Sequence, residues 1–223
     1  MKKNYIVKGF HDTVSERFPA QKDELYIALN KRLSELRLEN ADASKEKKRH
    51  LESQIMLGIA AYETLQTVMP KEEALQTVHG YVEDHAYKLR KAFLKVMRIP
   101  GLYRRVPEVF AKQTPKLFGK AAGFAATEYQ VSGGVWRIDM TRCPYHDTCV
   151  QYHCPELCHC FCDSDDITYD NLHPELIWHR TKTLGRGNDC CDFSLKIKGK
   201  EIFSHNKPQK FVLLGFQRGA DRI

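Results

Sequence analysis

Cysteine is the residue type whose placement in this chain most strongly suggests chemistry. All of the cysteines in the 223-residue sequence lie in one segment of it: Cys143, Cys149, Cys154, Cys158, Cys160, Cys162, Cys190 and Cys191. Cysteines that serve only as small core residues have no reason to gather in this way. Their concentration predicts that thiols take part in catalysis, ligand contact or metal binding at one place.

Metal binding is one alternative for this segment. Cys143–Cys149 carries the pattern C-x2-H-x2-C, and Cys154–Cys162 carries C-x3-C-x-C-x-C, so ligands that zinc accepts are present. The sequence has no CxxC pair, however, and structural zinc usually shows two such pairs. The spacings also match neither common iron–sulfur pattern. We therefore assign no metal ligand and expect no cofactor, with a structural zinc kept as an alternative.

A thiol–carboxylate pair is the other possibility. Residues 155–171 are predicted to form a helix, since Pro155 suits a first helical turn. On this helix Cys158 and Cys162 stand four residues apart and share a face, which Asp165 or Asp166 and Tyr169 extend. A carboxylate alone raises the pKa of a thiol, so activation of Cys162 would require a nearby cation.

The following hairpin is predicted to supply this cation. Strands at Glu175–Leu184 and Cys190–Ile197 flank a glycine-containing turn. By the two-residue period of a strand, Arg180 shares its face with Trp178 and Lys182. A buried arginine requires an anionic partner. The candidate partners are Asp165, Asp166, Asp192 and a substrate carboxylate. Taken singly, each of these residues is more often structural than functional, so the predicted site depends on their concentration.

The periodicity of the sequence predicts an α+β fold, in which an N-terminal helical layer is followed by an antiparallel sheet with an inserted helix. The expected helices are Asp23–Leu38, Ser44–Met69, Pro70–Ile99, Tyr103–Lys112 and Pro155–Asn171. The expected strands are Gly123–Val131, Val135–Met140, Glu175–Leu184, Cys190–Ile197 and an edge strand at Phe211–Phe216. Residues 1–20 mix polar and apolar residues without a clear period, and Pro19 ends this short segment.

Charge and hydropathy narrow the classes of partner. Residues 1–142 hold 25 basic and 17 acidic side chains, so the excess of positive charge lies outside the cysteine segment. The N-terminus lacks the apolar core of a secretory signal, and no run approaches the ~18 apolar residues of a membrane span. We expect a cytoplasmic location, no membrane partner and no persistent disulfide. The basic stretch Lys88–Lys120 leaves a zinc-stabilised adaptor for nucleic acid as an alternative, but without a nucleic-acid motif we favour a solvated face.

Residues 51–198 resemble the L-2-amino-thiazoline-4-carboxylic acid hydrolase family. The matching pieces are Gly58–Tyr62, Arg142–Tyr145, Pro155–Cys158, Phe161–Asp163, Arg180–Leu184, Gly187, Asn188 and Cys191–Phe193. The resemblance implies hydrolysis of a cyclic isothiourea to a carbamoyl-cysteine. Three cysteines lie outside the family pattern, which argues against a metal site built from all eight: Cys149, Cys154 and Cys160. A more distant likeness to small-ligand domains of the vinyl-reductase and transport-particle type favours the same fold and a pocket.

Three segments are expected from this comparison: an N-terminal helical extension at 1–50, a family-like α+β domain at 51–200, and a C-terminal tail at 201–223 that packs on it. The leading hypothesis is a hydrolase of a small heterocycle with a carbon–nitrogen or carbon–sulfur bond to cleave. Its predicted catalytic residues are Cys162 as nucleophile, Asp165 as base and Cys143 in the pocket. Its predicted substrate-binding residues are Arg180, Thr183, Cys191, Asp192 and Cys158. A non-enzymatic binding or sensor domain with the same pocket is the alternative.

Overall fold

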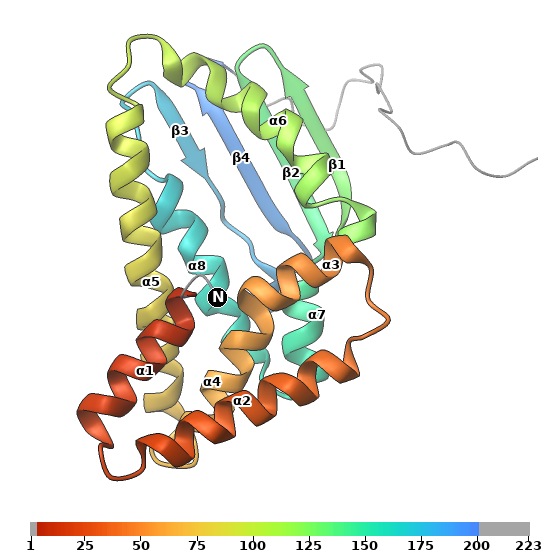
Figure 1. The fold of residues 1–223 in the computed structure, drawn as a ribbon. Helices are drawn as coiled ribbons and strands as arrows, with labels where there is room; N and C mark the ends of the chain where they lie inside the picture. Colours follow the sequence, from red (N-terminus) through yellow and green to blue (C-terminus); the bar gives the residue numbers. More distant parts are fainter. Residues whose placement is uncertain (1–3, 201–223) are drawn as a thin grey trace, which may run out of the picture.

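The computed structural model describes residues 4–200, except for the side chains of residues 128–132. The predicted edge strand at Phe211–Phe216 and the predicted packing of the tail lie outside the described residues. Within them the predicted α+β class is confirmed, with helices preceding a four-stranded antiparallel sheet. Figure 1 shows the helical layer at one end of the molecule and the sheet at the other.

The helical layer is built from five α-helices: α1 (Tyr5–Arg17), α2 (Lys22–Glu39), α3 (Lys45–His50), α4 (Met56–Leu65) and α5 (Lys71–Val96). A π-helical segment, η1 (Leu51–Ile55), joins α3 to α4 without a break. The helices predicted around α2 and α5, and the one spanning α3 to α4, are therefore confirmed. Ser44 caps α3, because its side chain accepts a hydrogen bond from the backbone of Lys47.

The expectation of a mixed segment before Pro19 was wrong, because residues 5–17 form α1. Ile6, Phe10 and Val14 recur every four residues and are fully buried, so the segment gains its stability from packing. The Asn4 side chain accepts a hydrogen bond from the backbone of Ile6 and starts the helix. Val, Thr and Gly within the segment have low helix propensity, which hid the pattern in the sequence.

The sheet has the strand order β1-β2-β4-β3, with every neighbouring pair antiparallel. Its strands are β1 (Ala125–Ser132), β2 (Val135–Arg142), β3 (Leu176–His179) and β4 (Cys191–Ile197). The helices and turns around it are η2 (Leu102–Arg105), α6 (Val106–Leu117), η3 (Lys120–Ala122), α7 (Pro144–Gln151), η4 (Pro155–Leu157), α8 (Cys158–Tyr169) and η5 (Leu184–Arg186). Both predicted hairpins and the inserted helix are confirmed.

Two differences between the prediction and the structure lie close to the cysteines. The strand expected to reach Leu184 ends at His179, because the next backbone N–H groups bond to side chains instead of a strand. Thr181 and Lys182 donate to Asp192 at 2.8 and 2.6 Å, and Thr183 donates to Asn188 at 3.0 Å. The helix α7, absent from the prediction, begins at Pro144, where the proline suits the first helical position.

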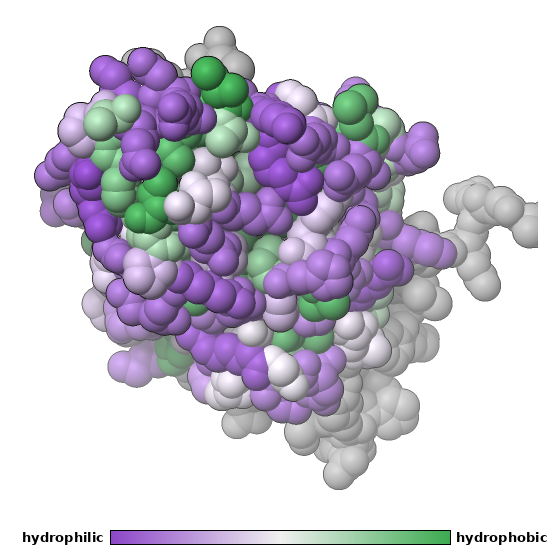
Figure 2. Space-filling model, turned by 90° about the horizontal axis from the view of Figure 1, so that it is seen from below, coloured by the Kyte–Doolittle hydropathy of each residue, from purple (hydrophilic) through white to green (hydrophobic). Residues whose placement is uncertain are grey.

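The interior contains two hydrophobic cores. One lies among α1, α2, α4, α5 and α8, and the other between α6 and the sheet. Figure 1 shows α6 crossing one face of the sheet, with α8 running beside α5 toward the helical end. Figure 2 shows that hydrophilic residues cover most of the outer surface at the helical end. Among the described residues, no helix is both long and apolar enough to span a membrane.

Candidate active site between the two cores

Four cysteine thiols form a continuous series of contacts inside the helical core. Cys149 interacts with the thiols of Cys154 and Cys158, and the sulfur atom of Cys158 lies 4.0 Å from that of Cys162. Cys149, Cys154 and Cys158 are buried, whereas Cys162 keeps partial solvent access. The series therefore leads from the helical core to Cys162 at its edge, and all eight cysteines of the chain are free thiols.

Two further thiols approach Cys162 from the sheet side. Cys143 stands between β2 and α7, and Cys191 begins β4. Both interact electrostatically with Cys162 and with each other. The structure thus brings together three predicted site cysteines that are far apart in sequence, and Cys158 contacts one of them, Cys162.

Three side chains at the boundary between the two cores are partly exposed and yet desolvated. Cys143, Tyr145 and Asp165 each keep partial solvent access, and burial is the main cause of the raised pKa of all three. The Tyr145 hydroxyl donates to Gln54 at 2.9 Å, which fixes its ring between α7 and η1.

Asp165 has the electrostatic properties of a catalytic base. Desolvation raises its pKa to about 7, with the Asp166 carboxylate adding to the rise and Arg180 opposing it. Its side chain remains 40% exposed, so solvent or a ligand can reach it. Asp165 also interacts with the Cys162 thiol one turn earlier on α8. A carboxyl group with this pKa can accept and return a proton near neutral pH.

The thiol of Cys162 is held in its protonated form. The neighbouring Cys158 thiol, and then burial, raise the pKa of Cys162 above its ordinary range, while Arg180 opposes them only weakly. The sequence predicted that a cation would activate this thiol, but Arg180 lowers its pKa only slightly. Reaction at Cys162 requires a base that removes its proton as the new bond forms, and the Asp165 carboxyl group interacts electrostatically with this thiol.

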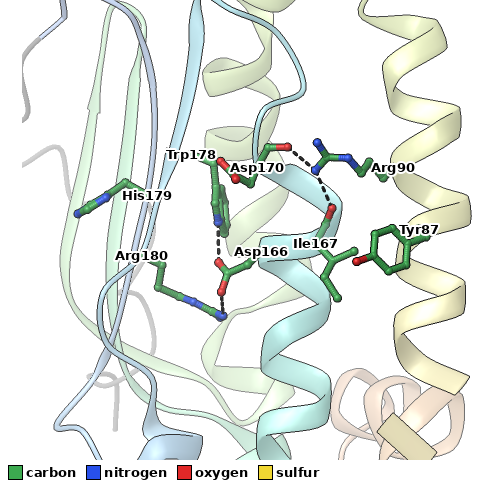
Figure 3. Close-up of a pocket in the computed structure, with 8 residues that line it drawn as sticks. All are labelled: Tyr87, Arg90, Asp166, Ile167, Asp170, Trp178, His179 and Arg180. Carbon is green, nitrogen blue, oxygen red and sulfur yellow. Dashed lines mark hydrogen bonds and ion pairs between the residues drawn. The ribbon is translucent and has the colours of Figure 1, made fainter. Parts of the chain in front are cut away.

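Arg180 is buried at the start of the connection between β3 and β4, with only 1% of its side chain exposed. Its Nη2 atom donates to Asp166 at 2.5 Å and to the carbonyl of Cys162 at 2.9 Å. The guanidinium group also lies over the Phe193 ring, 5.2 Å from its centre. Figure 3 shows Trp178 and Arg180 converging on Asp166, whereas His179 points to the opposite side. Trp178 donates to the other Asp166 oxygen at 2.8 Å.

The second terminal nitrogen of Arg180 has no hydrogen-bond acceptor among the described residues, although it is buried. It lies 3.6 Å from an oxygen of Asp165, beyond hydrogen-bond distance. An unsatisfied buried donor costs free energy, about 1–3 kcal/mol or more for a charged group. The Nη1 atom therefore remains available to the acceptor group of a ligand.

The predicted substrate-binding residues Asp192 and Thr183 differ in what their side chains contact. Asp192 accepts hydrogen bonds from the backbone of Thr181 and Lys182 and from the Thr181 hydroxyl. Thr183 is buried, and its hydroxyl has no partner among the described residues. Asp192 thus has its oxygens in use, while Thr183 keeps a free hydroxyl beside the site.

A pocket of about 620 Å³ adjoins this arrangement on the side of α5. Its lining is drawn in Figure 3 and consists of Tyr87, Arg90, Asp166, Ile167, Asp170, Trp178, His179 and Arg180. Arg90 closes its far end by donating to the carbonyl of Ile167 at 3.0 Å. The pocket meets the predicted site at Arg180 but contains none of its cysteines.

Sequence analysis missed Tyr145, Trp178 and Asp163 as residues of this region. Tyr145 lies in the quoted Arg142–Tyr145 motif, where an aromatic side chain beside a cysteine was the available signal. The contact between Trp178 and Asp166 depends on how β3 meets α8, for which the sequence holds no signal. Within residues 4–200, no three His, Cys, Asp or Glu side chains are arranged to hold a metal ion.

Fold and site together define the class: an α+β protein with thiols, a carboxyl group that titrates near neutrality and a buried arginine where its two cores meet. The model of the L-2-amino-thiazoline-4-carboxylic acid hydrolase family matches residues 48–195, about two thirds of the chain, and the protein belongs to this family. The match confirms the resemblance and includes every predicted site residue. No curated protein matches the chain.

Proposed function

We propose that the protein hydrolyses a small cyclic substrate that resembles 2-amino-thiazoline-4-carboxylate, giving a product of the carbamoyl-cysteine type. The family supports hydrolase chemistry, and the substrate class is our extension of it. The observation that carries the proposal is the pairing of Cys162 with Asp165, whose pKa of about 7 suits a base at neutral pH. Arg180 beside them offers a free donor for a carboxylate.

In the proposed reaction, Asp165 takes the proton from Cys162 as the sulfur attacks the ring carbon between nitrogen and sulfur. The bond from that carbon to the ring sulfur breaks, and the departing sulfur takes the proton from Asp165. An isothiourea then links the substrate to Cys162. Asp165 next removes a proton from water, which attacks the same carbon, and the Cys162 sulfur leaves with that proton. The product carries a carbamoyl group and a free thiol.

Arg180 positions the substrate in this proposal. Its Nη2 atom is fixed by Asp166 and the Cys162 carbonyl, so Nη1 presents a donor of defined direction to the substrate carboxylate. Cys143, Cys191 and Cys158 surround the reacting sulfur and limit the size of the ring, and Thr183 adds a hydroxyl. The carboxylate would satisfy the buried donor that the free protein leaves without an acceptor.

The test is turnover of 2-amino-thiazoline-4-carboxylate, followed as the appearance of the carbamoyl product. Wild-type protein is expected to produce it, and Cys162→Ser to lose about two or more orders of magnitude in kcat, since a hydroxyl is a weaker nucleophile. Cys160→Ala is the matched control, because this buried thiol lies on the same helix but packs into the helical core. Full turnover by Cys162→Ser would refute the proposed nucleophile.

A non-enzymatic binding or sensor domain is the second candidate. The observation that favours it is the raised pKa of Cys143, Cys158 and Cys162, which keeps these thiols protonated and unreactive. Such a domain would bind the carboxylate ligand through Arg180 without consuming it. Ligand binding by calorimetry with no product after prolonged incubation would establish this second candidate in place of the first.

A further inference from the structure

The connection between β3 and β4, residues 180–190, crosses the site as a strap. Apart from the single turn η5, it has no regular structure, and side chains hold it in shape. Within the strap, Thr183 donates to Asn188 at 3.0 Å and Lys182 pairs with Asp189 at 2.9 Å. At its first residues, Arg180 anchors the strap to Asp166 of α8, and Asp192 of β4 accepts from the backbone of Thr181 and Lys182.

The middle of the strap lies directly against the thiols. A Cβ atom added to Gly185 would stand only 3.1 Å from the sulfur atoms of both Cys158 and Cys162, and 3.3 Å from the backbone nitrogen of His159. The preceding residue, Leu184, donates its N–H to the sulfur of Cys191 at 3.3 Å. The strap therefore covers the helix thiols and the sheet thiol at once, and glycine is the residue that permits this close approach.

One ion pair holds the exposed middle of the strap to the helices. Arg186 donates to Asp163 of α8 at 2.7 Å, and the other Asp163 oxygen lies 3.4 Å from His79 of α5. Burial opposes ionisation of Asp163, but the contacts with His79 and Arg186 outweigh it and lower its pKa to about 2. In the part of the chain that the structure describes, no other ion pair links strap residues 181–190 to a helix.

We propose that the strap gates access to Cys158 and Cys162, with Asp163 and Arg186 as the latch that keeps it closed. Movement of Gly185 and Leu184 away from α8 would uncover both sulfur atoms. Closure would exclude water and hold a bound ligand against Cys162. The meaning of this gate for catalysis rests on the proposed function, whereas the gate itself is a property of the free protein.

The gate is tested by alkylating the native protein with N-ethylmaleimide and measuring the modification of each cysteine over time by mass spectrometry. We expect slow modification of Cys158 and Cys162 in the wild type. Arg186→Ala should accelerate both by about tenfold, the scale expected when a charge-assisted contact that restrains local opening is lost. Asp163→Asn should act in the same direction, and so should Gly185→Ala, because its methyl group displaces the strap.

Lys182→Ala is the matched control. Lys182 is a strap cation of similar exposure to Arg186, but its partner Asp189 also belongs to the strap. The variant therefore leaves the Asp163–Arg186 latch intact, and the modification rates of Cys158 and Cys162 should not change. The buried Cys154 reports global unfolding and should keep its wild-type rate in every variant. Equal acceleration by both alanine variants, or no acceleration by Arg186→Ala, would overturn the gate. Neither result depends on turnover, so failure of the gate and failure of the proposed hydrolase are distinguishable.

Discussion

At the scale of single residues, burial determines what each group of the site can do. Desolvation raises the pKa of Asp165 into the neutral range and that of Cys191 to about 11. A protonated thiol beside a carboxyl group that titrates near neutral pH needs no preformed thiolate, since the proton can move during attack. The site differs in this respect from one in which a cation lowers the thiol pKa.

The pH dependence of the reaction should follow Asp165. Because the base must be ionised, kcat/KM is expected to rise with pH through about 7, and Asp165→Asn should remove this rise along with most of the activity. The measurement is a pH–rate profile with the thiazoline substrate. A rise that persists unchanged in Asp165→Asn would assign the titration to another group.

The same carboxyl group should affect stability with a defined sign. Its pKa is raised on folding, so the folded state holds a proton that the unfolded state has released. Stability is therefore expected to fall as pH rises from the ordinary Asp pKa, about 4, to about 7. Thermal unfolding measured at several pH values across this range should show that Tm falls less steeply with pH in Asp165→Asn than in the wild type. The same dependence of Tm on pH in both proteins would contradict the raised pKa of Asp165.

Arg180→Lys separates the structural role of this residue from its role in binding. A lysine cannot donate to Asp166, the Cys162 carbonyl and a ligand in fixed directions, so both Tm and ligand affinity should fall. The expected loss of binding free energy is about 1–3 kcal/mol, the scale of a hydrogen bond to a charged group. Melting curves and calorimetric titration measure the two effects. Arg142→Lys, an exposed ion-paired arginine, is the control. A lowered Tm with unchanged affinity would remove Arg180 from the ligand site.

At the scale of elements, close packing between helices positions the layer that supports α8. The first helix, α1, approaches α5 at Gly9, where an added Cβ atom would stand 2.4 Å from the Tyr81 ring. The Tyr81 hydroxyl donates to Thr13 at 2.7 Å, so the ring is held in place against α1. A glycine within a helix normally lowers its stability, and here the loss is offset by the contact that it permits.

Gly9→Ala is therefore expected to destabilise the protein by about 1–3 kcal/mol, because the methyl group overpacks against the Tyr81 ring. Gly80→Ala in α5 provides the opposite case, since nothing lies within 4 Å of its added Cβ atom. That variant should gain up to about 1 kcal/mol from helix propensity. Urea unfolding of both variants measures the difference. An unchanged free energy of unfolding in Gly9→Ala would show that α1 can move away from the Tyr81 ring without loss of stability.

At the scale of the whole molecule, the site exists only where the two cores meet. The helical core supplies Cys158, Cys162 and Asp165 on α8, while the sheet and its connections supply Cys143, Arg180 and Cys191. Any change that separates the layers would disperse these groups without altering one of them. The cysteines at this boundary are free thiols.

We expect thiol titration of freshly purified, unreduced and denatured protein to find eight reactive groups. No pair of thiols needs to be oxidised for the two cores to meet, since packing already holds them together. Metal analysis of the same sample serves as the control, because a bound metal could also mask thiols. A clearly lower thiol count in a metal-free sample would contradict this prediction.

Local pattern alone was sufficient for much of this structure. Helices α2 and α5 follow from apolar residues at three- and four-residue spacing, and both hairpins follow from alternating segments around glycine turns. The family was also recognisable from short motifs between Gly58 and Phe193. Cys158, Cys162 and Asp165 could be placed on one helix face because their spacing fits a helical turn.

Tertiary structure decided the rest. Arg180 leaves the strand because Asp192 binds the next two N–H groups, and Asp163 pairs with Arg186 across 23 residues of sequence. The pKa of Asp165 depends on atoms contributed by both cores. Periodicity records which residues lie on one face of a single element, but hydrogen bonds and desolvation between elements depend on distances that appear only when the two layers pack together.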